Sequence, residues 1–213
     1  MLAILVPARN EEENIGCVLD LLKEINSSPE NIFVIDNDSN DKTAEIAIKR
    51  KVKVIYVKEV GYEKAISRAL KNIKELKFTK FMIVDGDNEI DRKSIEEMFN
   101  SVSSFNFLCG KRNNVKRIGE KIVNLYYKRT YEIDDLMCGL KAGDLELHNQ
   151  EAKLSFGLDM FKFEEMFEKK IKNIDVLVNQ RKSTRLGNFI KVNTLLILGL
   201  LKYHFVHKNT KHL

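Results

Sequence analysis

The sequence predicts an α/β fold in which a mostly parallel sheet is flanked by helices. Short apolar runs alternate along the chain with longer segments of helical periodicity, which is typical of this fold class. Polar loops follow the strand candidates at their carboxyl ends, where open α/β sheets bind ligands. The 213 residues, 44% hydrophobic and 31% charged, suffice for one globular domain with a large core.

Each expected element follows from the spacing of its apolar residues. Apolar runs predict strands at 2–6, 32–36, 53–58, 80–84, 106–109 and 174–178. Between the first two strands, Ile15, Val18, Leu22 and Ile25 recur at helical spacing, and Asp41 is a candidate cap for a helix over residues 44–48. Further helices are expected near 62–75, 92–103, 116–131, 158–170 and 192–206.

The composition excludes several classes of protein. Three widely spaced cysteines form no Cys-x-x-Cys pair, which argues against a disulfide framework or a zinc site and favours a reducing, cytoplasmic compartment. The longest apolar stretch, Thr194–Leu201, is too short to span a bilayer, and the chain begins directly with a strand-like run. A net charge of +5 is compatible with an anionic partner or with simple solubility, and no basic aromatic face indicates nucleic-acid binding.

Four polar loops at the strand ends are the candidate site. Residues 7–11 (Pro-Ala-Arg-Asn-Glu) follow the first strand, and the Asp-rich segment 36–41 ends the second. Gly61 and its neighbours follow the third strand. Taken singly, each loop is also explained by helix capping or an Asx-type turn. Because parallel strands end at one edge of a sheet, the four together indicate a ligand site.

The fourth loop, Asp85-Gly86-Asp87, follows the buried strand candidate 81–84. Two carboxylates flanking a glycine can turn toward one point, and Glu89 adds a third oxygen ligand nearby. Such oxygens suit Mg²⁺ or Mn²⁺, hard cations that share their coordination with substrate phosphates. The same three residues can form an ordinary turn.

The order and spacing of these loops resemble the family 2 glycosyltransferases, in particular the dolichyl- and polyprenyl-phosphate sugar (mannose or glucose) synthases. Residues 6–11 are similar to the family's V-P-x-x-N-E motif, and residues 35–43 to its V-D-[DN]-x-S-x-D-x-T motif. Further along, residues 85–87 match D-x-D, residues 110–112 a glycine-arginine motif, and residues 135–142 D-x-x-[ST]-G-[FL]-[RK]-A. The resemblance covers residues 1–190 and implies a single-domain GT-A fold, a Rossmann-like nucleotide-diphospho-sugar transferase.

The resemblance also implies a donor site and a metal. Asp36 would accept a hydrogen bond from the nucleobase, and Asp87 would bind the cation that bridges the diphosphate. The expected nucleotide-sugar-binding residues are Pro7, Ala8, Arg9, Asn10, Glu11, Asp36, Asp38, Gly61, Lys64, Asp85 and Gly86. The expected Mg²⁺ or Mn²⁺ ligands are Asp85, Asp87 and Glu89. Such a cation offsets charge on the departing nucleoside diphosphate.

The acceptor side departs from the family pattern. Glu63 stands where the family's G-x-G-x-A segment has its second glycine, and Phe189 replaces the serine of the closing R-x-G-x-S-K element. By analogy, the acceptor phosphate would be bound by Arg112, Arg129, Arg181 and Arg185. Asp135 is the candidate general base for a hydroxyl acceptor. The expected catalytic residues are Asp87, Asp135 and Arg112.

The leading hypothesis is therefore a metal-dependent inverting glycosyltransferase that uses a UDP- or GDP-sugar and a polyprenyl phosphate. One alternative keeps the donor and replaces the acceptor by a soluble hydroxyl or a glycan. A sugar-1-phosphate nucleotidyltransferase would need a glycine in the first loop, which has none, and a non-enzymatic sugar-nucleotide binder would not need its acids. Residues 191–213 form either an amphipathic basic helix on the cytoplasmic face of a membrane or a core-packing helix with a frayed end.

Overall fold

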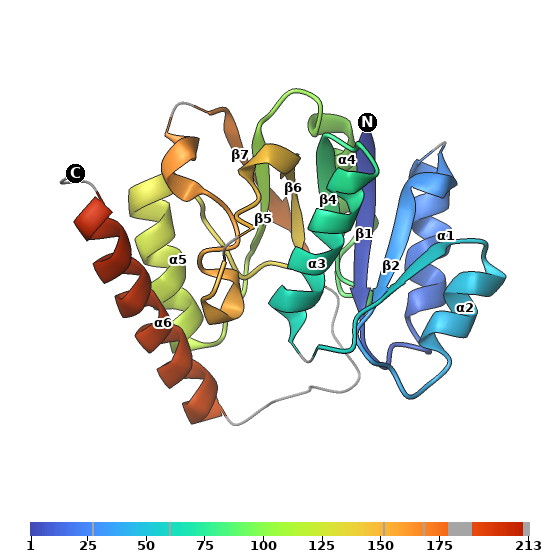
Figure 1. The fold of residues 1–213 in the computed structure, drawn as a ribbon, viewed down its shortest axis with the longest axis horizontal. Helices are drawn as coiled ribbons and strands as arrows, with labels where there is room; N and C mark the ends of the chain where they lie inside the picture. Colours follow the sequence, from blue (N-terminus) through green and yellow to red (C-terminus); the bar gives the residue numbers. More distant parts are fainter. Residues whose placement is uncertain (27, 60, 151, 168, 179–188, 211–213) are drawn as a thin grey trace.

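A seven-stranded sheet with helices on both faces forms the molecule (Figure 1). This computed structural model describes residues 1–213 except 27, 60, 151, 168, 179–188 and 211–213. The strand order is β3-β2-β1-β4-β6-β5-β7. The strands are β1 (Leu2–Ala8), β2 (Ile32–Asp36), β3 (Lys53–Tyr56), β4 (Lys80–Val84), β5 (Phe107–Arg112), β6 (Leu140–Asp144) and β7 (Ile171–Val176).

The first four strands are parallel, which brings the ends of β1, β2 and β4 to one edge of the sheet. The register pairs Ala8 with Asp36, and Leu5 with Ile83 on the other side of β1. β6 is antiparallel to both of its neighbours, and β7 pairs in parallel with β5. The predicted mostly parallel sheet is therefore confirmed, with one antiparallel strand inside it.

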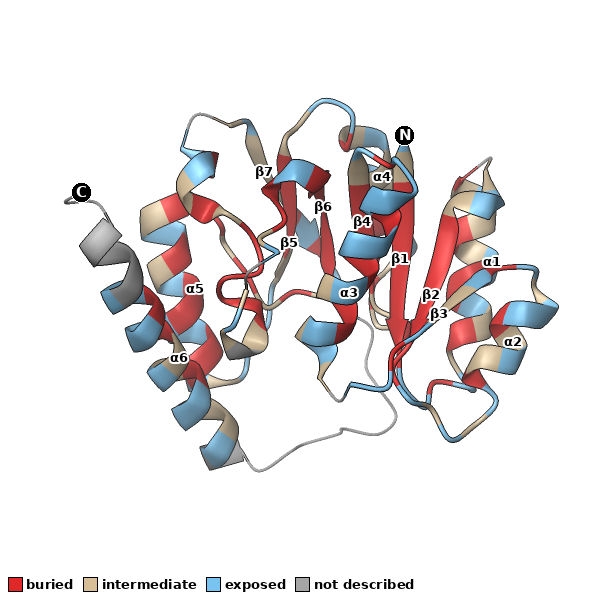
Figure 2. Cartoon of the chain, viewed as in Figure 1, coloured by how far each residue is buried: buried red, intermediate tan, exposed pale blue. Residues whose placement is uncertain are grey.

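Alternation of side chains along the strands produces two separate cores, one on each face of the sheet (Figure 2). Ala3 and Leu5 of β1 face one core, whereas Ile4 and Val6 face the other. The first core is covered by α3 (Tyr62–Glu75), α5 (Ile118–Tyr131) and α6 (Phe189–Thr210). The second is covered by α1 (Ile15–Ile25), α2 (Thr43–Lys49) and α4 (Arg92–Ser101).

The helix α6 packs in parallel beside α5. Asn193 Oδ1 accepts a 2.8 Å hydrogen bond from the Gly119 amide, and the Tyr131 and Tyr203 hydroxyls lie 3.0 Å apart at the other end. Leu196 and Leu200 are buried on the inner side of α6. Its outer side exposes four large apolar side chains, Leu195, Leu198, Leu201 and Phe205. None of the helices in the described part of the chain combines the length and apolar character that crossing a membrane requires.

Three expectations about elements differ from the structure. The described residues of the segment expected to form a helix over 158–170 contain a short 3-10 turn, Phe163–Met166, and no α-helix, because Phe161 bridges to His148 and its neighbours follow an irregular path. The strand β6 was not predicted, although residues 135–142, which overlap it, were matched to a family motif. The predicted strand at 174–178 lies earlier, at Ile171–Val176.

Candidate active site

The first two loops are tied to each other by reciprocal hydrogen bonds. The Asn10 amide donates to Ser39 Oγ at 3.0 Å, and Asn10 Oδ1 accepts from the Asn40 amide at 2.8 Å. The Glu11 amide donates to Thr43 Oγ1 at 2.8 Å, and Thr43 is the first residue of α2. Asn10 adopts a left-handed conformation with φ of 54°, which asparagine tolerates better than most residues. Asn10 therefore shapes the edge of the site.

A pocket of about 350 Å³ opens where β1, β2 and β4 end. It contains eight of the residues predicted for the donor and the metal: Pro7, Ala8, Arg9, Glu11, Gly61, Asp85, Gly86 and Asp87. Asn37, Tyr62 and Ala65 complete its lining. We call this the donor pocket. Most of the predicted donor residues thus gather in one place.

Asp36 lies at the base of this region, at the end of β2. Its side chain is 5% exposed, and Oδ1 has no hydrogen-bond partner among the described residues. The next residue, Asn37, lines the donor pocket and is held by hydrogen bonds from its side-chain amide to the carbonyls of Val57 and Glu59. A buried carboxylate oxygen without a partner is costly, so a ligand donor that reaches it would be favoured.

The Asp85 carboxylate lies on the boundary of the donor pocket. The Tyr62 hydroxyl donates to Asp85 Oδ1 at 2.6 Å. Burial and the charge of nearby Asp87 raise the pKa of Asp85 to about 7, although the bond from Tyr62 acts in the opposite direction. A Cβ on Gly139 would lie 1.9 Å from Asp85 Oδ2, so a residue without a side chain is needed there.

Two carboxylates that repel each other in this way suit a divalent cation. The described residues contain no group of three His, Cys, Asp or Glu side chains arranged to hold a metal ion. The predicted set of Asp85, Asp87 and Glu89 is therefore not assembled, and Glu89 does not line the donor pocket. Its amide instead donates to Asp87 Oδ1 at 3.1 Å, after a left-handed turn at Asn88. Mg²⁺ commonly needs only one or two carboxylates, with phosphates and water completing its shell.

Arg112 and Asp135 form a buried pair at the end of β5. The guanidinium donates in a bidentate manner, Nε to Oδ2 at 2.7 Å and Nη2 to Oδ1 at 3.0 Å. Asn124 also donates to Oδ1 at 2.9 Å, and Nη2 reaches Glu120 at 3.0 Å. Burial alone would raise the pKa of Asp135, which is 1% exposed, but the hydrogen bond and charge of Arg112 lower it overall. Both Asp135 oxygens are therefore occupied by donors.

A second pocket, of about 330 Å³, lies on the other side of Tyr62. Its cations are Arg112, Arg117 and Lys141. Its apolar wall includes Val192 and Leu196 of α6. Tyr62 is the residue that lines both this pocket and the donor pocket. We label this second pocket the acceptor pocket after the role that we propose for it below.

Several predicted site residues do not reach either pocket. Asn10 and Asp38 lie on the exposed rim, and Arg129 is exposed on α5, away from the face that buries Val123 and Tyr127. Lys64 lines a third cavity and neither of these two. Arg181 and Arg185 lie outside the described residues.

Sequence reasoning missed several residues that form these pockets. Tyr62, Arg117, Glu120 and Lys141 all line the acceptor pocket. Glu63 lines it too, and its carboxylate approaches within 3.8 Å of where a Cβ on Gly61 would lie. The departure from the family pattern at Glu63 was the one available signal in the sequence.

The fold is of the α/β GT-A-like class. The chain belongs to glycosyl transferase family 2, whose family model matches residues 3–150. The more specific resemblance to the dolichyl-phosphate sugar synthases is not confirmed.

Two sequence relatives are distant. The chain is 31% identical over 158 residues to uncharacterized protein MJ1222 of Methanocaldococcus jannaschii, which is 67% of this chain and 64% of that protein. It is 30% identical over 99 residues to protein RfbJ of Shigella flexneri, which is 46% of this chain and 74% of that protein. The match thus spans slightly less than two thirds of the first relative's length.

The fold is similar to that of glucosyl-3-phosphoglycerate synthase from Mycobacterium tuberculosis. The complex of that enzyme with Mn²⁺, uridine diphosphate and phosphoglyceric acid has a TM-score of 0.74 at 15% identity, over 95% of this chain and 78% of that one. A complex with Mn²⁺, UDP-glucose and glycerol 3-phosphate has a TM-score of 0.68 at 14% identity, over 95% and 79%. At such identities the similarity establishes the fold alone.

Proposed function

We propose that this protein transfers a sugar from a nucleoside-diphosphate sugar in the donor pocket to a hydroxyl group of a soluble acceptor in the acceptor pocket. The observation that carries the proposal is the convergence of Arg9, Glu11, Asp85 and Asp87 on one pocket beside the unpartnered Asp36 oxygen. Asp36 would accept a hydrogen bond from the base. The UDP complexes of the M. tuberculosis enzyme support UDP as the first nucleotide to test.

Asp87, with Asp85 beside it, would hold Mg²⁺ or Mn²⁺. The proximity of these two carboxylates supports such a site, since burial first and the charge of Asp87 second raise the pKa of Asp85. When bound, the cation would neutralise negative charge on the departing nucleoside diphosphate. The hydrogen bond from Tyr62 would keep Asp85 oriented toward the pocket.

The acceptor hydroxyl would approach from the side of Tyr62 that faces the acceptor pocket and displace the nucleotide with inversion. Glu63 is our candidate for the general base that takes the hydroxyl proton. Of the carboxylates that line this pocket, Glu120 is paired with Arg112 and Arg117, and Glu63 has no ion pair among the described residues. Glu63 would therefore be available to accept a proton.

Arg112 would bind an anionic group on the acceptor, such as a phosphate or carboxylate, with Lys141 beside it. We assign Asp135 a positioning role and not that of the base, because both its oxygens already accept hydrogen bonds from Arg112 or Asn124. The phosphorylated acceptors named in the M. tuberculosis complexes support an anionic acceptor.

The first experiment measures the affinity of UDP and GDP by calorimetry, with and without Mn²⁺. We expect one nucleotide to bind more tightly with Mn²⁺ and expect Asp87→Ala to lose this metal-dependent gain. Asp175→Ala, which changes an exposed carboxylate on β7, serves as the control. No nucleotide binding by the wild-type protein, or an unchanged metal effect in Asp87→Ala, would contradict the proposal.

A second candidate keeps the donor and uses a polyprenyl phosphate as the acceptor. The observation in its favour is α6, which lines the acceptor pocket with Val192 and Leu196 and exposes an apolar outer side. A phosphate acceptor is already a charged nucleophile and needs no base. Glu63→Gln would therefore reduce kcat strongly with a hydroxyl acceptor and leave transfer to dolichyl phosphate almost unchanged.

A further inference from the structure

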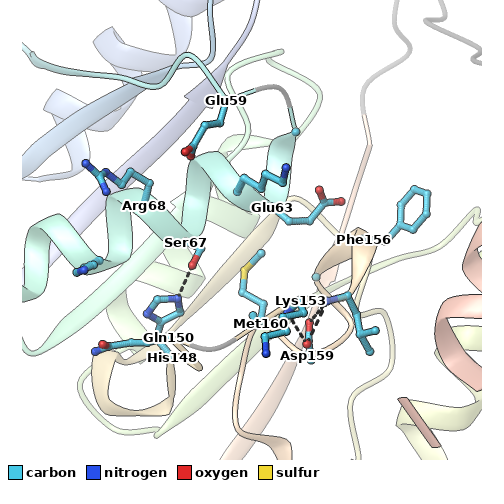
Figure 3. A pocket seen from close by; sticks show the side chains of 16 residues that line it. Glu59, Glu63, Ser67, Arg68, His148, Gln150, Lys153, Phe156, Asp159 and Met160 are labelled. Carbon is cyan, nitrogen blue, oxygen red and sulfur yellow. Dashed lines mark hydrogen bonds between the residues drawn. The ribbon is translucent and has the colours of Figure 1, made fainter. Parts of the chain in front are cut away.

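A third cavity, of about 630 Å³, lies against α3, and Glu63 is the one residue of its lining to which the proposed reaction gives a role (Figure 3). One wall is a face of α3 that carries Glu63, Ser67, Arg68 and Lys71. The opposite wall is the segment from His148 to Met160, which leads from β6 toward the turn at Phe163. We call it the α3 cavity. It shares Gly61 with the donor pocket. It shares Glu63, Phe156, Gly157 and Met160 with the acceptor pocket.

The wall opposite α3 is held in place by the carboxylate of Asp159. Its oxygens accept hydrogen bonds from the amides of Lys153 at 2.7 Å and Leu154 at 3.0 Å. The side chain of Asn149 donates to the Asp159 carbonyl at 2.9 Å. Asp159 is 7% exposed, so these bonds are sheltered from water and the wall is built before any ligand enters.

Cations outnumber the carboxylates that are free to oppose them. Lys64, Arg68, Lys71 and Lys153 line the cavity, and none has an ion pair within the described part of the chain. The carboxylates are Glu59 and Glu63, near the start of α3, and Asp159, which is already occupied by the amides. Because a helix rises about 1.5 Å per residue, Lys71 lies roughly 12 Å along α3 from Glu63. The charge of the cavity is therefore negative near Gly61 and positive further along the helix.

A buried, partly unpaired histidine lies at the positive end. His148 is 3% exposed, and its Nε2 lies 3.1 Å from Ser67 Oγ (Figure 3). Its Nδ1 has no hydrogen-bond partner among the described residues. If the Ser67 hydroxyl donates to Nε2, the neutral ring carries its proton on Nδ1. A ligand oxygen would then satisfy a donor that is otherwise buried without a partner.

We propose that the α3 cavity binds an anionic group, a phosphate or a carboxylate, at the end formed by Arg68, Lys71 and His148. The guanidinium of Arg68 and the ammonium of Lys71 supply charge-assisted hydrogen bonds, and His148 supplies a neutral donor. Two sources of this group are compatible with the cavity. One is a second anionic group at the far end of the acceptor, beyond the group that Arg112 would bind and reached past Phe156 and Gly157. The other is a separate phosphorylated ligand.

The binding test is a calorimetric titration of inorganic phosphate at constant ionic strength. We expect the Kd for phosphate to rise by about tenfold or more in the double variant Arg68→Glu/Lys71→Glu, because two attractive charges become repulsive. The control Lys93→Glu/Lys121→Glu makes the same change in net charge at exposed lysines on α4 and α5 and should bind phosphate like the wild type. Arg68→Gln/Lys71→Gln, which removes the charges without reversing them, replaces the first variant if that variant does not fold.

Equal phosphate affinity in the Arg68/Lys71 variant and the wild type would overturn the proposal, as would the absence of phosphate binding by the wild type. A kinetic arm distinguishes the two sources and rests on the proposed function. If the group belongs to the acceptor, the variant raises KM for phosphorylated acceptors and not for their unphosphorylated counterparts. If the anionic group belongs to a separate ligand, the variant loses phosphate binding, and its KM is unchanged for phosphorylated and unphosphorylated acceptors alike. UDP binding to the wild type tests the proposed function independently of either result.

Discussion

The hydroxyl of Tyr62 donates a 2.6 Å hydrogen bond to Oδ1 of Asp85, joining the first residue of α3 to the residue after β4. Tyr62 lines both the donor pocket and the acceptor pocket. Under the proposed function, the bond would therefore connect the wall between the two substrates to a carboxylate beside the nucleotide. A substitution of Tyr62 should consequently change the metal-dependent binding that we propose for the donor pocket.

We predict that Tyr62→Phe weakens the binding of UDP with Mn²⁺ by roughly fivefold, equivalent to about 1 kcal/mol for one lost hydrogen bond. The melting temperature should change little, because Tyr62 is 41% exposed. Calorimetry measures the first quantity and a thermal melt the second. Tyr56→Phe, at a more exposed tyrosine on β3, is the matched control, and equal UDP affinities in the two variants would contradict the prediction.

Gly139→Ala should displace Asp85 without touching the rest of the donor pocket. The added Cβ would lie 1.9 Å from Asp85 Oδ2, so the carboxylate must move. We expect UDP binding to become nearly independent of Mn²⁺, as in Asp87→Ala. Gly16→Ala is the control, because its Cβ would meet the end of the flexible Arg50 side chain at 2.8 Å. Retention of the Mn²⁺ effect in Gly139→Ala would show that Asp85 does not need its present orientation.

Asp135→Ala should lower the free energy of unfolding by about 3 kcal/mol. It removes the buried acceptor of hydrogen bonds from Arg112 and Asn124, and it leaves Glu120 as the charged partner of the Arg112 guanidinium. Its neighbour provides the comparison. Asp134 pairs with Lys111 and Lys128 in more exposed ion pairs, so Asp134→Ala should cost less than about 1 kcal/mol. Urea denaturation of both variants measures the difference. Similar losses for the two would mean that burial does not govern the strength of the Arg112–Asp135 pair.

The stability of the protein should fall in mild acid because of His148. Burial first, and the charge of Lys74 second, lower the pKa of His148 to about 4. An unfolded histidine has a pKa of about 6.5 and takes up a proton more readily. The folded state is thus favoured fully above about pH 6.5 and progressively less as the pH falls toward 4. The cations Arg68 and Lys71 line the same cavity and also oppose a charged ring.

Denaturation curves at pH 7.5 and pH 5 test this effect. We expect the wild type to lose about 2 kcal/mol more than His148→Gln over this range, since glutamine does not titrate. Carboxylates titrate equally in both proteins, so their contribution cancels in the comparison. An equal pH dependence in the two proteins would mean that His148 is not held neutral.

The strands β1, β2 and β4 were predictable because each is a nearly continuous apolar run followed by polar residues. In β6, by contrast, Lys141, Gly143 and Asp144 interrupt the apolar pattern. It is a strand because it lies between β4 and β5 and pairs with both. Tertiary pairing here overrides local preference. The prediction of a helix at 158–170 is wrong for a related reason. Phe161 and Phe163 are two residues apart and both pack into the same core, whereas residues two apart in a helix do not share a face.

The donor pocket was predictable because strand ends in a parallel sheet share an edge, so loops far apart in sequence could be grouped. The acceptor side could not be grouped in this way. Arg112 and Asp135 are 23 residues apart on either side of α5, and nothing local indicates that they pair. Arg129 carries the same charge as Arg112, yet it lies on the exposed face of α5. Its side of the helix depends on its position relative to the buried residues of α5, and its charge gives no information on that. The pairing of Asp85 with Tyr62 likewise depends on where α3 begins.

The bonds that join Asn10 to Ser39 and Asn40 have a consequence for how a nucleotide would bind. Because they form during folding, the entropy of ordering this rim is lost then and not when the ligand arrives. Under the proposed function, this rim would therefore already be formed when a nucleotide arrives. A preformed rim would not have to reopen before the product leaves.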